Sequence, residues 1–124
     1  MPAHIQYRVG QFRDAIRQNI LAAQVDENYI QTANASPIYR YGYYTHNLHF
    51  VVTSARQGGG GTTALEYAEK LDSALPTEMA TQFAIAQPVK AAPWFARAQF
   101  GTTAAILAAA APANGLTYVI GAWR

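Results

Sequence analysis

Residues 45–75 read THNLHFVVTSARQGGGGTTALEYAEKLDSAL and contain two helical patterns separated by four glycines. The apolar residues before the glycines recur at i, i+3, i+4 and i+7, as on one face of an α-helix. These residues are Leu48, Val51, Val52 and Ala55. The stripe after the glycines consists of Ala64, Leu65, Ala68, Leu71 and Leu75. Because glycine is a poor helix former that permits tight turns, the stretch predicts an antiparallel helix hairpin.

Local signals also mark the ends of the second helix. Thr63 followed three residues later by Glu66 forms the pattern of a capping box. Glu66 and Lys70 have the i, i+4 spacing of a helical ion pair. Pro76 is expected to end the helix, since proline cannot continue the hydrogen-bond ladder.

Helical patterns continue on both sides of this hairpin. After Gly10, one face of a predicted helix carries Phe12, Ala15, Ile16, Asn19, Ile20 and Ala23. The last apolar stripe consists of Leu116, Val119, Ile120 and Trp123. No segment alternates as a strand does, so the sequence predicts one all-α domain over residues 1–124. Its expected parts are hairpins at about 2–30, 45–75 and 77–111, an unpaired last helix at 114–124 and a tyrosine-rich loop at 32–44.

The tyrosine-rich segment interrupts the helical periodicity. Ser36-Pro37 and Gly42 are turn signals, and four tyrosines lie within the six residues 39–44. Two interpretations remain open at this point: a loop held down by its own aromatic rings, or a recognition loop for a ligand.

Composition narrows the class of protein. The 124 residues are 51% hydrophobic and 13% charged, which favours a packed interior over disorder. The net charge is only +2 and the basic residues are scattered, so no nucleic-acid partner is expected. The absence of cysteine excludes disulfides and thiol chemistry.

The start lacks the pattern of a secretory signal, and the longest apolar run, Ala104–Ala111, is too short to cross a bilayer. We therefore expect a cytoplasmic chain without membrane contact.

Glycine recurs before predicted helices along the chain. Gly10, Gly59 and Gly101 each precede a predicted helix, with Ala15, Ala64 and Ile106 five residues later. A glycine turn followed by a small residue lets two antiparallel helices approach closely. Hairpins of this kind bury their apolar faces by stacking on one another, so the pattern predicts a solenoid.

These positions resemble the tetratricopeptide-repeat family. The segments Pro2–Ala15, Tyr41–Phe50 and Phe100–Leu107 are similar to segments that occur in the same order in larger proteins built from divergent repeats of this kind. The resemblance implies a short right-handed α-solenoid that is a piece of a longer one. It also implies a concave face lined by the first helix of each hairpin, and protein or peptide partners on that face.

Histidines mark the candidate site. His46 and His49 are expected on one side of a helix, in a stripe that continues through Thr53 and Arg56. The resemblance places His4 near that stripe. Arg8 lies four residues after His4 and is expected on the same helical face, and Tyr7 is expected to join this surface. Three roles for these residues remain open. They could bind a peptide carboxylate, the three imidazoles could bind a transition metal, or the side chains could form structural hydrogen bonds alone.

No motif in the sequence indicates catalysis. The run Gly58–Gly61 lacks the lysine and the strand of a phosphate-binding loop, and neither a catalytic triad nor an HExxH motif is present. Asp26, Glu27 and Asp72 are interpreted as solvated charges. The predicted function is therefore a non-catalytic scaffold without a cofactor, and the alternative is a histidine-based metal or small-ligand site of a larger enzyme or assembly.

The end of the chain carries a further expectation. The last apolar stripe has no following helix to cover it, so we expect self-association through this helix, folding back onto the domain, or marginal stability.

Overall fold

A computed structural model describes residues 2–112 and 115–124, which form helices and no strand. The α-helices are α1 (Pro2–Arg8), α2 (Phe12–Thr32), α3 (Thr45–Gln57), α4 (Gly61–Ala74), α5 (Thr77–Gln82), α6 (Gln87–Phe100), α7 (Thr103–Leu107) and α8 (Thr117–Trp123). A π-helix, η1 (Tyr39–Tyr44), precedes α3, and a 3₁₀ turn, η2 (Ala84–Ala86), precedes α6. Within this part of the chain, no helix combines the length and apolar character needed to span a membrane.

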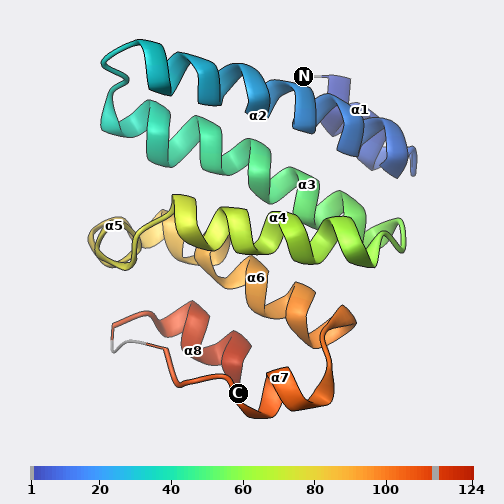
Figure 1. The fold of residues 1–124 in the computed structure, drawn as a ribbon, viewed down its shortest axis with the longest axis vertical. Helices are drawn as coiled ribbons and strands as arrows, with labels where there is room; N and C mark the ends of the chain where they lie inside the picture. The colour runs from blue at the N-terminus through green and yellow to red at the C-terminus, as the bar shows by residue number, and fades with distance from the viewer. Residues whose placement is uncertain (1, 113–114) are drawn as a thin grey trace.

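The helices pack antiparallel in layers. The longer ones follow one another along the long axis in the order α2, α3, α4, α6, with α1 beside α2 (Figure 1). In addition to its neighbours α2 and α4, α3 contacts α6, and α6 contacts α8. The all-α class and the antiparallel packing predicted from the sequence are confirmed.

The predicted apolar stripes form the main core. Leu48, Val51, Val52 and Ala55 of α3 are fully buried, as are Ala64, Ala68 and Leu71 of α4. Many of the buried side chains in the seams are alanines, which allows the helix axes to approach closely. The helical period read from the sequence therefore identified the face on which each of these helices packs.

The glycines act in two different ways. Gly10 and Gly59 have φ values of 81° and 74°, the left-handed backbone that glycine adopts without a Cβ clash. Gly101 has φ −72° and needs no special backbone. A Cβ at Gly101 would come within 2.4 Å of the Arg97 carbonyl oxygen, so glycine is required there for close approach.

The tyrosine-rich segment is helical, and its prediction as a loop is wrong. Only residues 33–36 lie outside helices, and the chain is helical from Pro37 through η1 into α3. The i→i+5 hydrogen bonds of a π-helix place residues five apart about one turn apart. Tyr39 and Tyr44 can therefore both face α2, where their hydroxyls donate to Asp26 at 2.5 Å and to Glu27 at 2.8 Å.

These two carboxylates are not the solvated charges expected from the sequence. Asp26 is 7% exposed and also accepts a 2.8 Å hydrogen bond from the Asn47 side chain. Its hydrogen bond to Tyr39 raises the pKa of that tyrosine, because an anion beside the hydroxyl disfavours the phenolate. Burial, followed by the hydrogen bond to Glu27, raises the pKa of Tyr44. A polar network thus holds η1 on α2.

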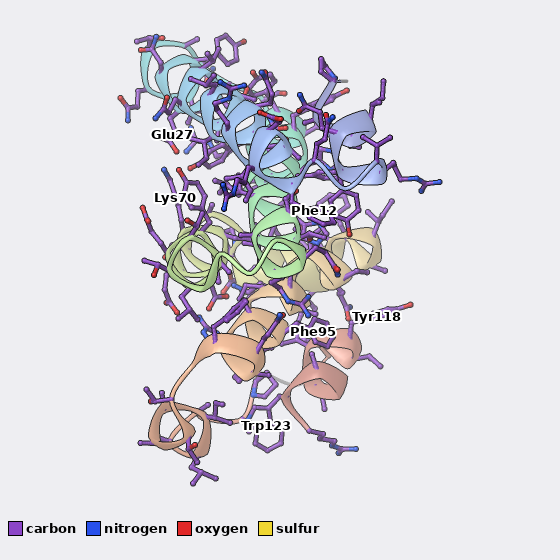
Figure 2. All side chains as sticks on the ribbon, turned by 90° about the vertical axis from the view of Figure 1, so that its right-hand side faces the viewer. Phe12, Glu27, Lys70, Phe95, Tyr118 and Trp123 are labelled. Carbon is purple, nitrogen blue, oxygen red and sulfur yellow. The ribbon has the colours of Figure 1, made fainter. Side chains whose placement is uncertain are left out.

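Neither of the local interactions predicted for α4, the capping box and the Glu66–Lys70 ion pair, forms. The helix begins at Gly61, two residues before Thr63, and no side chain caps it, so the capping box does not form. Lys70 pairs with Glu27 of α2 at 2.6 Å instead of with Glu66. Both partners lie on the same side of the stack (Figure 2).

Asp72 on α4 is likewise half-buried. Lys90 and Arg97 of α6 pair with its carboxylate at 2.6 and 2.9 Å. Burial alone would raise the pKa of Asp72, but the hydrogen bonds from these two cations outweigh it and hold the pKa below its ordinary value. The interpretation of Asp72 as a solvated charge is therefore wrong, since it joins α4 to α6.

The end of the chain folds back onto the domain, one of the three outcomes expected for it. Leu116 and Val119 are each 2% exposed and pack against Ala80 and Ala91, so the expectation of an unpaired, uncovered last helix is wrong for them. Self-association through these two side chains is no longer expected. Residue 114, the predicted start of this helix, lies outside the described residues.

The third predicted hairpin, 77–111, is irregular. It contains α5, η2, α6 and α7 instead of two long helices, because the extended backbone at Phe83 and Gly101 divides it. Pro88 lies in the first turn of α6, and Pro93 lies inside that helix without ending it. All five residues of α7 are exposed.

Candidate functional site

The first and third helices meet through two histidines. His4 on α1 and His46 on α3 bring their Nε2 atoms to within 3.2 Å of each other. Their rings are nearly parallel, with an angle of 17° between the planes and 5.2 Å between the centroids. Both side chains are partly exposed. The expected proximity of His4 to the α3 stripe is therefore present in the structure.

Aromatic rings hold this pair in place. Phe50, one turn after His46, has its centroid 3.9 Å from that of His4 and 5.1 Å from that of His46. Tyr7 of α1 packs edge-on against Phe50 and against Phe12 of α2. Edge-to-face packing of this kind stabilises a fixed ring arrangement. Tyr7 thus supports the histidine pair through Phe50.

His49 occupies a different environment from the pair. It is partly buried in α3, and this burial lowers its pKa to about 4, with further contributions from the charges of His46 and Arg56. Burial, followed by the charge of His4, also lowers the pKa of His46. Both imidazoles are therefore neutral at neutral pH.

Arg56 connects α3 to α6. Its Nε–H donates to the Gln99 side-chain oxygen at 3.0 Å, and the Gln99 amide donates back to the Arg56 carbonyl oxygen at 3.2 Å. The guanidinium lies 5.4 Å from the centroid of the Phe95 ring, a cation–π arrangement. Phe95 itself is 46% exposed. This end of the α3 stripe therefore presents a cation next to an open aromatic ring.

The two remaining predicted residues do not take part in these contacts. Arg8 is exposed in the last turn of α1, where a positive charge suits the helix dipole. Thr53 is partly buried on α3, between Phe50 and Arg56 in sequence.

The three-histidine metal centre considered above does not form. Among residues 2–112 and 115–124, no group of three or more His, Cys, Asp or Glu side chains could hold a metal ion. His4 and His46 come together and His49 does not complete a ligand set with them. The side chains available at the site are accordingly an imidazole pair, a guanidinium and aromatic rings, which can bind a ligand through hydrogen bonds, charge and stacking.

Sequence reasoning missed three residues of this region. Phe50 and Phe95 have the spacing of ordinary core aromatics, and Gln99 carries no motif. The signal that could have found Phe50 is its position four residues after His46, on the same helical face. Phe95 and Gln99 could not be assigned, because their partner Arg56 is about forty residues away in the chain.

Comparison of the chain with family models, with curated proteins and with solved structures finds no match.

Proposed function

We propose that this chain is a non-catalytic helical scaffold that binds a protein or peptide segment along α1, α3 and α6. The observation that carries the proposal is the continuity of this surface across three helices. His4 of α1 contacts His46 of α3, and Arg56 of α3 contacts Phe95 of α6. His46 and Arg56 are ten residues apart on one helix, so the surface extends about 15 Å, enough for a short peptide.

The arrangement of helices supports a solenoid of the tetratricopeptide type. α1 and α3, the first helices of the first two hairpins, contact each other on this surface, and α3 also contacts α6 of the third. The second helices α2 and α4 are bridged by the Glu27–Lys70 pair, which joins a different set of layers. Two rows of helices of this kind are what stacked hairpins produce. We propose the right-handed solenoid on this basis, with Gly10 and Gly59 as the hairpin turns.

The chemistry of the surface favours an acidic segment that carries an aromatic side chain. The Nε–H of Arg56 is held by Gln99, which leaves the two Nη groups for a carboxylate. The half-exposed ring of Phe95 offers a stacking partner beside that cation. The imidazoles of His4 and His46 at the other end carry ring nitrogens that can take part in hydrogen bonds.

A peptide selection tests this proposal. Displayed 12-residue peptides are selected on the chain in the presence of a chelator, and the affinities of the selected peptides are measured by fluorescence polarisation. The double variant His46→Ala/Arg56→Ala should lose at least about tenfold in affinity, since two contacts worth about 1 kcal/mol or more are removed. The control Arg13→Ala/Arg17→Ala changes exposed residues of α2 and should bind as the wild type does.

Two results would contradict the proposal. One is a failure to select any peptide that binds above background. The other is a selected peptide that binds the His46/Arg56 variant as tightly as the wild type, with circular dichroism showing that the variant is folded.

A further inference from the structure

The two histidines direct the same nitrogen at one point. The Nε2 atoms of His4 and His46 are 3.2 Å apart, whereas the ring centroids are 2.0 Å further apart, at 5.2 Å. The Nε2 corners therefore point into the space between the rings. The small angle of 17° between the ring planes means that their lone pairs lie in similar planes.

This spacing suits two ligands of one metal ion. Zn²⁺ binds imidazole nitrogen at about 2.0–2.1 Å, and tetrahedral angles then put two nitrogens about 3.3 Å apart. An N–H···N hydrogen bond between neutral imidazoles has a similar nitrogen–nitrogen distance. The geometry therefore allows either a proton or a metal ion to join the two rings. The ligand chemistry favours the metal ion, because imidazole is a preferred ligand for Zn²⁺ and Cu²⁺.

The pair is both preorganised and accessible. Phe50 lies against both imidazoles and limits their rotation, so little ordering is needed when an ion binds. Both histidines are partly exposed, which gives an ion a path from solvent. The ligands come from α1 and α3, so the ion would tie the first helix to the second hairpin.

We propose that His4 and His46 bind one divalent transition-metal ion of the Zn²⁺ type through their Nε2 atoms. Two protein ligands leave the remaining positions of a tetrahedral ion for water or an outside donor. The site is thus a binding site with open positions and differs from a closed structural zinc centre. It does not depend on the peptide-binding proposal, since the ligands are side chains of this chain alone.

Titration with ZnCl₂ alone, without peptide, tests the site. Isothermal calorimetry on the full chain after chelator treatment should show one ion per chain. His4→Ala and His46→Ala should each weaken binding by at least about tenfold, because even loss of a supporting contact to a metal ligand costs 10–100-fold. The matched control His49→Gln should keep the wild-type affinity. MgCl₂ should produce no binding, as Mg²⁺ prefers oxygen ligands.

Nuclear magnetic resonance on the wild type keeps the test independent of variant folding. ZnCl₂ should shift the Nε2 resonances of His4 and His46 and leave that of His49 in place. Three results would overturn the metal site and leave a hydrogen-bonded pair. The wild type binds no zinc, both alanine variants bind zinc as tightly as the wild type, or the Nε2 resonances of His4 and His46 do not change. These outcomes are separate from those of the peptide selection, which is performed with chelator present.

Discussion

The layers α2, α3 and α4 differ sharply from α7 in how they are held. Leu48, Val51 and Leu71 between the layers are 0% exposed, whereas Ile106 and Leu107 of α7 are 43% and 81% exposed. A mostly apolar cavity of about 570 Å³ lies where α7 borders the rest of the molecule. Both regions have helix-forming sequences. The difference shows that helix propensity alone does not produce packing.

The side chains explain this difference. The core between the layers contains alanine together with leucine and valine, so a close approach of the helices is combined with a large buried apolar area. Residues 103–111 consist mainly of alanine, which is an excellent helix former but buries little area. Trp123, which donates its indole N–H to the Ala109 carbonyl oxygen at 3.4 Å, borders the cavity between these parts.

The largest expected effect breaks the packed layers. Leu71→Ala removes a fully buried side chain and should lower the free energy of unfolding by about 2–5 kcal/mol. Ile106→Ala, the matched change in α7, should cost less than about 1 kcal/mol because that side chain is already partly exposed. Urea denaturation of both variants measures the comparison. Equal losses would contradict the distinction between the two regions.

A second prediction concerns pH, because α3 carries a partly buried histidine, His49, whereas α7 has no titratable side chain. The pKa of His49 is about 4 in the folded chain and about 6.5 when unfolded, so the unfolded state binds the proton first. Stability contributed by the neutral imidazole is full above pH 6.5 and is lost as pH falls toward 4, by at most about 3 kcal/mol.

Urea midpoints measured between pH 7.5 and 4.5 in chelator check this prediction. His49→Gln should reduce the slope of stability against pH, with the remainder due partly to His46, whose pKa is also lowered. An unchanged slope in the variant would show that His49 is not the responsible group.

The smallest expected effect lies in α7. The Thr102 hydroxyl accepts from the Ala105 N–H at 3.2 Å and caps this helix. Thr102→Ala should destabilise α7 itself by about 1 kcal/mol. Global unfolding should change by less than about 0.5 kcal/mol, since α7 adds little packing. Hydrogen exchange should speed up in α7 only. A fall in the global unfolding midpoint comparable to that of Leu71→Ala would contradict this account.

The elements that sequence reasoning predicted well are those set by local periodicity. The stripes of α3 and α4 and the turns at Gly10 and Gly59 follow from side-chain period and backbone freedom. The helical conformation of residues 37–44 could not be predicted. Pro37 and Gly42 favour a turn in the sequence. The hydrogen bonds that hold this segment as a helix against α2 are made with Asp26 and Glu27 of that helix.

The residues of the site also differ in whether local sequence could predict them. The position of His46 and Arg56 on one helix was predictable from spacing, and the proximity of His4 came from the family resemblance. The role of Phe95 depends on a contact between helices distant in the chain. The burial of Leu116 and Val119 likewise depends on the path by which the chain returns to α6.

The central claim is that α1, α3 and α6 form one surface. Nuclear Overhauser spectroscopy of the wild-type chain tests it most directly. The account predicts cross-peaks between the ring protons of His4 and His46, and between the Arg56 side chain and the Phe95 ring. A folded chain that shows neither contact would contradict it.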